Sequence, residues 1–306
     1  MAQVTAALVK ELREKSGAGM MDCKKALSET DANIDAAVDW LRTKGLAAAA
    51  KKATRIAAEG LVAVKVDGTK GAVAEVNSET DFVARNEQFQ EFVGTIAEVA
   101  FTVGEDVDAI KSATYPGSKK SVEETLTDNI AIIGENQSIR RARTLEVDEG
   151  VVVPYMHNAV TAGMGKIGVL VALKSSADAS VLTSLGKQIA MHIAATNPAS
   201  LNEASLDPEM VEREKTVQIE KAKESGKPME IIDKMIIGRM RKYMEEVVLL
   251  SQAFVMDPDT KVGKVIENAA KEAGTAIELV DYVRMELGDG IEKKEEDFAA
   301  EVASLT

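Results

Sequence analysis

The chain has 306 residues, of which 45% are hydrophobic and only 4% aromatic, a composition typical of a globular protein. Its 50 acidic and 37 basic residues give a formal net charge of −13, which opposes non-specific binding to nucleic acid because such binding requires cations that neutralise phosphates. A single cysteine, Cys23, excludes an internal disulfide framework and fits a reducing compartment.

Neither an export signal nor a membrane span is indicated. The N-terminal stretch MAQVTAALVKELREKSG carries charges through its apolar positions, so it lacks the uninterrupted apolar region of a secretory signal. No stretch of the sequence is apolar enough to cross a bilayer. We therefore expect a cytoplasmic protein that binds neither a membrane nor nucleic acid directly.

The first 52 residues predict a small module of three helices. Apolar residues recur at helical spacing in two places: Val4, Leu8 and Leu12, then Ile34, Val38 and Leu41. The glycines of SGAGMMDCKKAL separate the first helix from the second. The alanine-rich stretch that follows has high helix propensity but little to bury, so we expect a mobile connector around residues 45–60.

Two stretches predict β-hairpins, and each is followed by a helix. In the first, residues 61–66 and 72–76 flank the turn pair Asp67-Gly68. The second lies in GVVVPYMHNAVTAGMGKIGVLVALK, and DASVLTSLGKQIAMHIAAT predicts the helix after it. The repeated order of hairpin and helix predicts a core of two related α+β subdomains with antiparallel sheets.

A helical hairpin is predicted further along the chain. Residues 208–225 and 229–250 are charged, helix-rich runs separated by SGKP, which stops one helix and starts another. The second run carries an apolar stripe: Ile232, Ile236, Met240, Tyr243, Val247 and Leu250. Packing of the two helices on each other, as an antiparallel coiled coil, accounts for this stripe. An additional contact with a second chain stays open.

The last part of the chain predicts a helix in TKVGKVIENAAKEA, a strand in AIELVDYVRMEL and a short amphipathic helix in GIEKKEEDFAAEVASL. The predicted fold class is therefore α+β. We expect these parts: an N-terminal helical module at 1–52, a linker at 53–60, core subdomain N at 61–148, core subdomain C at 149–206 and 251–287, a coiled-coil hairpin at 207–250, and a C-terminal helical module at 288–306.

The sequence offers little for catalysis. Gly163, Gly165 and Gly168 match a dinucleotide-binding pattern, but a strand follows them where a helix is required, so they indicate a hairpin turn. His192 lies on an apolar face and is expected to be structural and hydrogen-bonded, whereas His157 near a strand end is only a weak candidate contact. Phosphate loops, zinc ligand clusters and nucleophile elbows are missing from the sequence, and we expect neither an enzyme nor a bound metal or cofactor.

The stretch NSETDFVARNEQF is open to two interpretations. Ser78 and Asp81 fit the capping pattern S-x-x-D, which predicts a helix that begins at Ser78. The apolar residue that should then pack against Phe82 is instead Asn77, and Asn86 is able to cap a separate helix. TDFVAR is then a single projecting turn whose phenylalanine is buried only in a partner. The residues alone leave both interpretations open.

Several motifs together resemble one family. SGAGMMDCKKAL, TDFVARN, IAMHIAA, SGKP with GRM, and GIEK with DFAAEV occur in the order typical of bacterial translation elongation factor Ts. The resemblance covers essentially the full chain. It implies a ubiquitin-associated-like N-terminal module, a two-subdomain α+β core, a protruding coiled coil and a C-terminal helical module.

The resemblance also implies a function. A member of this family binds elongation factor Tu, both GDP-bound and nucleotide-free, and promotes GDP release so that GTP can enter. Thr80, Asp81, Phe82 and Val83 match the stretch that dislodges magnesium from that partner. Three further residues are implied as partner contacts: Met20, Met21 and His157. Core packing of the two methionines stays open as an alternative.

Two other functions are compatible with the residues. In one, the hairpin at 207–250 makes the chain a coiled-coil scaffold or chaperone-like binding protein without exchange activity. In the other, the chain is an enzyme, for which the sequence offers no catalytic residues. The oligomeric state, including a homodimer or a 2:2 complex with the partner, also stays open.

Overall fold

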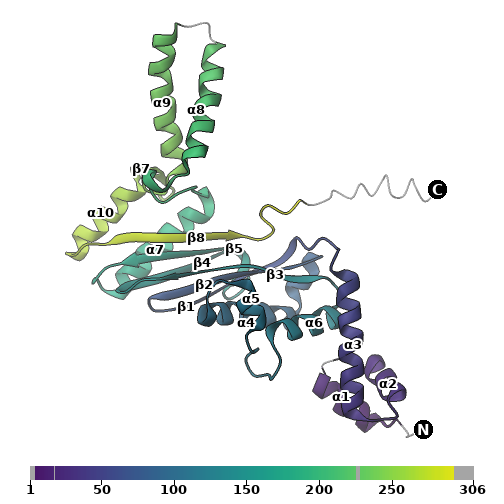
Figure 1. Ribbon diagram of the computed structural model, residues 1–306. Helices are drawn as coiled ribbons and strands as arrows, with labels where there is room; N and C mark the ends of the chain where they lie inside the picture. The colour runs from purple at the N-terminus through teal and green to yellow at the C-terminus, as the bar shows by residue number, and fades with distance from the viewer. Residues whose placement is uncertain (1–3, 17, 225–227, 293–306) are drawn as a thin grey trace. The chain divides into compact units, whose positions relative to one another are not determined.

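A computed structural model describes residues 4–16, 18–224 and 228–292 (Figure 1). The fold combines α-helices with antiparallel sheet. The chain divides into two compact units. The first comprises Met1–Ala63, Ala74–Ala142 and Glu286–Thr306, and the second comprises Val64–Val73 and Arg143–Met285.

The first unit begins with the three predicted helices: α1 (Ala6–Ser16), α2 (Met20–Glu29) and α3 (Ile34–Lys52). They share a small core of fully buried residues: Leu12, Cys23, Ala26, Leu27 and Ala37. Asn33 caps α3 because its side chain accepts a hydrogen bond from the Ala36 backbone N–H at 2.9 Å. The predicted three-helix arrangement is confirmed.

The expected mobile connector around residues 45–60 is wrong over its first half, because α3 continues as a regular helix to Lys52. This part of α3 packs on α6 (Val122–Ile133). Gly45 is buried there, and a Cβ atom on it would lie 3.5 Å from the Ala131 Cβ atom. The Lys52 ammonium donates to the Ile130 carbonyl at 3.4 Å. The helix therefore has a surface to pack on that its own sequence does not reveal.

The chain from residue 59 to residue 146 contains more structure than the sequence predicts. Strands β1 (Glu59–Asp67) and β2 (Lys70–Ser78) form the predicted hairpin, with Gly68 at the turn. Helix α4 (Glu87–Val103) follows and buries one face, which includes Phe89, Phe92, Val93 and Ile96. Helices α5 (Val107–Ser112) and α6 and strand β3 (Gln137–Glu146) were not predicted.

The second predicted hairpin is also present. Strands β4 (Gly150–Thr161) and β5 (Met164–Lys174) pair antiparallel, with Gly150 opposite Lys174 and His157 opposite Ile167. Gly163 lies in the turn between them at a φ of 73°, as predicted, whereas Gly165 and Gly168 belong to β5 and pair with Ala159 and Met156 of β4. The strand order is β3-β2-β1-β5-β4, and β8 (Glu278–Glu286) also pairs with β5. Both hairpins thus belong to one sheet, which the sequence did not indicate.

The core of the second unit is formed by β4, β5, α7 (Ala179–Thr196) and α10 (Val262–Ala273). Helix α7 lies close to β4 because Gly186 has no side chain: a Cβ atom there would approach Val153 to 2.5 Å. A separate two-stranded sheet, β6 (Ala253–Phe254) with β7 (Asp257–Lys261), precedes α10.

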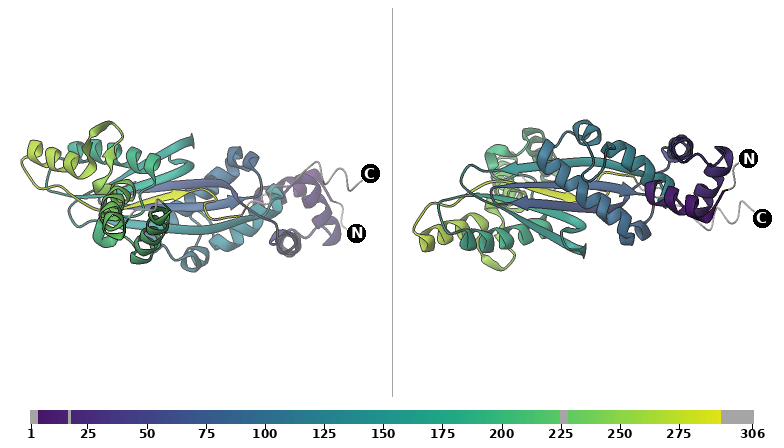
Figure 2. Two further views of the ribbon diagram at one scale, coloured as in Figure 1. Left: turned by 90° about the horizontal axis from the view of Figure 1, so that it is seen from above. Right: turned by 90° about the horizontal axis from the view of Figure 1, so that it is seen from below.

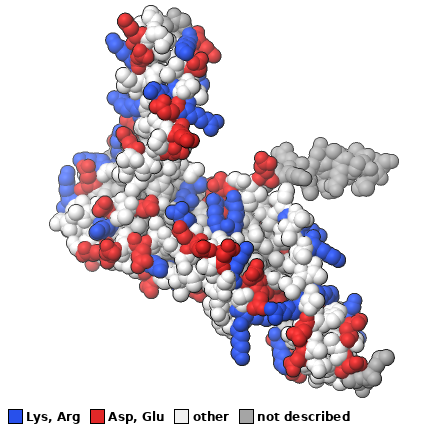
Figure 3. All heavy atoms as spheres, viewed as in Figure 1, with Lys and Arg blue, Asp and Glu red and all other residues white. Residues whose placement is uncertain are grey.

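The predicted helical hairpin consists of α8 (Pro208–Lys223) and α9 (Met229–Val247), which lie side by side in Figures 1 and 2. Ile232 and Ile236 are buried against Ala222, with Met240 packed beside them, which confirms the apolar stripe over these residues. Leu250, the last residue of the predicted stripe, lies beyond the end of α9 and packs on the core of the second unit. Acidic and basic side chains alternate over the outer surface of this hairpin (Figure 3). The helix expected near the C-terminus falls largely on residues 293–306, outside the described residues.

His192 is the structural, hydrogen-bonded histidine that the sequence predicts. Its Nε2–H donates to the Gln252 side-chain oxygen at 2.8 Å, and its Nδ1 accepts from the Val255 backbone N–H at 3.2 Å. Burial lowers the pKa of His192 below its usual value of 6.5. The neutral ring is the form that fits, because a proton on Nδ1 would face the Val255 N–H.

We expect His192 to make the free energy of unfolding depend on pH. Its folded-state pKa is lowered, so the unfolded chain binds more protons below about pH 6.5, and stability falls as the pH drops from there toward the folded pKa. His192→Gln should flatten this slope in urea titrations between about pH 5 and 7. A slope that survives His192→Gln would contradict this assignment.

Candidate functional site

The stretch between β2 and α4 forms a separate single turn of 3-10 helix, Asp81–Arg85 (hereafter the 81–85 turn). Helix α4 starts only at Glu87, because Asn86 has an extended backbone and its side chain accepts from the Phe89 N–H at 3.0 Å. The prediction of a single turn separate from the following helix is therefore confirmed, whereas burial of its phenylalanine in a partner stays a prediction. The hypothesis that a helix begins at Ser78 is wrong.

Ser78 has a different role from the predicted one. It is the last residue of β2 and is buried, and the residue that precedes the 81–85 turn is Thr80, so Ser78 does not cap a helix. Its hydroxyl instead donates to the Glu135 carboxylate at 2.9 Å. Asp81 remains the acidic residue in the first turn, but of the 3-10 helix alone.

The four residues matched to the family motif have different environments. Phe82 is 79% exposed, which is unusual for a phenylalanine, whereas the adjacent Val83 is only 6% exposed. Asp81 is exposed and Thr80 is half-buried. A turn this short places neighbouring side chains in different directions, so burying Val83 directs Phe82 into solvent. The surface that a partner can reach is therefore formed mainly by Asp81 and Phe82.

Glu135, which the sequence did not single out, holds the start of the turn. Its carboxylate accepts from the Thr80 backbone N–H at 2.9 Å and from the Thr80 hydroxyl at 2.6 Å, in addition to Ser78. The two segments are more than 50 residues apart, with separations of 55 and 57. No local pattern links them, which is why sequence reasoning missed this residue.

The methionines implied as partner contacts lie at the start of α2 in the first unit. Met20 is 61% exposed and Met21 is 77% exposed, so the alternative in which they pack in a core is wrong. The neighbouring Asp22 forms an ion pair with Lys44 of α3, which holds the start of α2 against that helix. Two adjacent methionines thus form an exposed apolar pair on a supported helix end.

His157 lies in the second unit, near the end of β4 that leads into the hairpin turn. It is exposed, and its Nδ1 lies 3.2 Å from the Tyr155 hydroxyl. The structure therefore places the matched residues in two units: Met20, Met21 and the 81–85 turn in the first, and His157 in the second.

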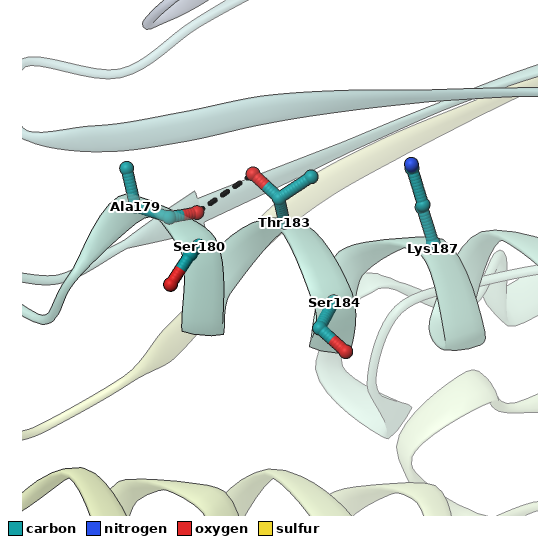
Figure 4. Close-up of a pocket in the computed structure, with 5 residues that line it drawn as sticks. All are labelled: Ala179, Ser180, Thr183, Ser184 and Lys187. Carbon is teal, nitrogen blue, oxygen red and sulfur yellow. Dashed lines mark hydrogen bonds between the residues drawn. The ribbon is translucent and has the colours of Figure 1, made fainter.

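A shallow hollow on α7 does not resemble a ligand site. It is lined by Ala179, Ser180, Thr183, Ser184 and Lys187 (Figure 4). The Thr183 hydroxyl donates to the Ala179 carbonyl of its own helix at 2.7 Å, as the dashed line shows. Among the described residues, no group of three or more His, Cys, Asp or Glu side chains is placed to hold a metal ion. No described helix has the length and apolarity that crossing a membrane requires.

Comparison with known proteins gives a consistent result. A family model described as elongation factor Ts matches residues 79–289. Elongation factor Ts of Rhizorhabdus wittichii is 62% identical over 304 residues, which cover 99% of each chain. The protein of the same name from Rhizobium rhizogenes is 61% identical over 305 residues, covering 100% of this chain and 99% of its own. That of Zymomonas mobilis is 60% identical and covers 99% of each chain.

Because Phe82 is exposed and Val83 is buried, replacing each by alanine should change the free energy of unfolding by different amounts. Phe82→Ala should change the free energy of unfolding by less than about 0.5 kcal/mol, because its side chain is already in water. Val83→Ala should cost about 1.5 kcal/mol, since it removes two buried methyl groups. Urea unfolding of both variants tests this. Equal losses of stability would show that Phe82 is packed in the core in solution.

Proposed function

Because the chain belongs to the elongation factor Ts family, it is a nucleotide exchange factor for elongation factor Tu in translation, and we propose that the 81–85 turn carries this activity. In this proposal the chain binds elongation factor Tu in its GDP-bound and nucleotide-free states. Phe82 and Asp81 disturb the magnesium site of the partner, GDP leaves, and GTP can enter. The chain itself makes and breaks no covalent bond.

The observation that supports this proposal most strongly is the exposure of Phe82, the second residue of a turn whose start is hydrogen-bonded to Glu135. Burying a phenylalanine side chain is worth about 1.5–3 kcal/mol, and this chain leaves that free energy unused. A partner with an apolar pocket beside its nucleotide site gains it on binding. The free energy is then available to move groups in the partner.

Magnesium is a sensitive target for such a displacement. The ion requires nearly octahedral oxygen ligands at about 2.0–2.1 Å, so a small shift of one ligand weakens its hold on the phosphates of GDP. The exposed carboxylate of Asp81 adds a polar contact beside the apolar one of Phe82. Thr80 and Val83 support these two residues from within the first unit.

Exchange by this route depends on a difference in the factor's affinity for the nucleotide-free and the GDP-bound partner. A factor that prefers the nucleotide-free partner lowers the partner's affinity for GDP, and GDP lowers the affinity for the factor by the same ratio. The factor is therefore released when GTP rebinds. Acceleration requires no catalytic residue of the acid-base or nucleophilic kind.

Further contacts and the finer division of the chain belong to the same proposal. We assign Met20 and Met21 of a ubiquitin-associated-like module, and His157 of core subdomain C, to partner binding. The proposed parts are those predicted above: helical module, linker, two core subdomains, coiled-coil hairpin and C-terminal module. We place the activity in the cytoplasm, without membrane or nucleic-acid partners. A homodimer or a 2:2 complex is compatible with this assignment.

The alternative of a coiled-coil scaffold assigns binding to the α8–α9 hairpin instead. It is supported by one feature of that hairpin, an exposed Ile237 that is 72% accessible on α9. Ile237 and Phe82 are thus two apolar side chains of similar exposure in different parts of the chain. They provide a matched pair of substitutions.

We expect Phe82→Ala to slow factor-stimulated release of fluorescent GDP from elongation factor Tu by about tenfold, which corresponds to losing about 1.4 kcal/mol of the burial that the partner supplies. The measurement is stopped-flow fluorescence at several factor concentrations, with melting curves of the same samples. Ile237→Ala should exchange GDP like the unchanged chain. The scaffold alternative predicts the reverse: no stimulation of release by the unchanged chain, and loss of partner binding only in Ile237→Ala.

A further inference from the structure

The carboxylate of Glu135 satisfies three donors at the start of the 81–85 turn. It accepts from the Ser78 hydroxyl at 2.9 Å, the Thr80 N–H at 2.9 Å and the Thr80 hydroxyl at 2.6 Å. Glu135 follows α6 directly after Gly134, which ends that helix in the left-handed conformation at a φ of 91°. The end of α6 thus fixes the position of the Glu135 carboxylate, which accepts hydrogen bonds from Thr80.

A second set of contacts joins the same two segments in the opposite direction. The backbone N–H of Asn136 donates to the Glu79 carboxylate, and the Asn136 side-chain amide donates to the Arg55 carbonyl at 2.7 Å. The Arg55 guanidinium lies 3.4 Å from the Glu79 carboxylate. Residues 78–80 and 135–136 are therefore held together by bonds from both sides.

The far end of the turn is held as well. The Asn86 N–H donates to the Val83 carbonyl at 2.9 Å, and the Gln90 side chain donates to the Ala84 carbonyl at 2.8 Å. Val83 and Ala84 are buried. The backbone on both sides of Phe82 thus has defined partners, while the side chains of Asp81, Phe82 and Arg85 are exposed.

We propose that Glu135 is a positioning residue for nucleotide exchange, which acts by holding Thr80 so that Phe82 enters the partner already ordered. The inference rests on the function proposed above. Glu135 is half-buried behind the turn, and its carboxylate is occupied by Ser78 and Thr80. A projecting side chain that is ordered before binding loses less conformational entropy when it enters a pocket of the partner. Without the carboxylate, that ordering has to occur during the exchange step.

The same geometry changes the role of two residues in the matched motif. Both hydrogen-bond donors of Thr80 point to Glu135, and Val83 is buried under the turn. Thr80 and Val83 are therefore supports of the turn, whereas Asp81 and Phe82 form its contact surface. A substitution of Thr80 acts through the position of Phe82.

Two substitutions of Glu135 distinguish the effect of its hydrogen bonds from the effect of its negative charge. Glu135→Ala removes every acceptor, so the donors of Ser78 and Thr80 lose the partner that holds them. Glu135→Gln keeps an oxygen for the Thr80 N–H, and its amide group can donate to the Thr80 hydroxyl, which also accepts hydrogen bonds. Asp106→Ala is the matched control, because Asp106 also accepts two backbone bonds, from Asp108 and Ala109 at 2.8 and 3.0 Å, but at the start of α5.

The first measurement is stopped-flow release of fluorescent GDP from elongation factor Tu as a function of factor concentration. Glu135→Ala should lower the maximal rate by about tenfold or more, because tenfold is the ratio expected for the loss of one charge-assisted hydrogen bond and this change removes three, while the half-saturating concentration changes less than about twofold. Glu135→Gln should recover most of the rate, and Asp106→Ala should be unaffected. In a Phe82→Ala background, Glu135→Ala should have little further effect, because both act through one side chain.

The second measurement needs no partner: amide hydrogen exchange of Thr80 by NMR on the full chain. Its N–H should be protected in the unchanged chain and in Glu135→Gln, and should lose protection in Glu135→Ala. Should Glu135→Ala not fold, Thr80→Val, which removes only the 2.6 Å hydroxyl bond, replaces it and should lower the maximal rate.

The two measurements distinguish the possible failures. If the unchanged chain fails to accelerate GDP release while Thr80 is protected as expected, the proposed function is wrong but the hydrogen-bonded support of the turn stands. If the unchanged chain accelerates release and Glu135→Ala does so at the same maximal rate, the positioning role is overturned. Equal loss in Asp106→Ala would also overturn it, since the effect would then be one of general stability.

Discussion

The cap that Asn86 places on α4 is the constraint on which the rest of the site depends. Its extended backbone, with a φ of −76° and a ψ of 123°, interrupts the helix, and its side chain satisfies the Phe89 N–H. Residues 81–85 therefore cannot join α4 and must form a turn of their own. Within one such turn, burying Val83 leaves Phe82 in water. An exposed aromatic side chain is thus a consequence of local backbone geometry.

An isolated turn of five residues has little stability of its own, so its surroundings have to hold it. Here β2 leads directly into it, α4 leads out of it, and Glu135 beyond α6 binds its first residues. Substitutions that loosen α6 should act on exchange through the turn, even where they lie far from Phe82 in the sequence.

Local sequence patterns predicted much of the fold, and the elements that they missed depend on contacts between residues far apart in the sequence. The two hairpins, the apolar stripe of α9 and the cap at Asn86 depend on residues a few positions apart. Strand β3, which was not predicted, carries two charged residues, Arg140 and Arg141. In the fold both are paired with the fully buried Glu75, at 3.0 and 2.6 Å. Their partner is more than 60 residues away, at separations of 65 and 66.

The same distinction between local patterns and distant contacts applies to the candidate site. The missing packing partner at Asn77 and the cap at Asn86, both of which are local, indicated an exposed Phe82 as one of two open interpretations, and the structure selects it. Glu135 could not be found that way, because its three bonds join segments that only the tertiary fold brings together. The extension of α3 to Lys52 was missed for a similar reason, since α6 supplies the surface on which it packs.

The central claim is that the turn acts on the magnesium site of elongation factor Tu, and the magnesium dependence of stimulated GDP release tests it most directly. Release is measured with and without saturating factor, first in excess magnesium and then after chelation. The account predicts that the factor accelerates release strongly when magnesium is bound and much less once the ion has been removed. The same ratio of stimulated to spontaneous release under both conditions would contradict it.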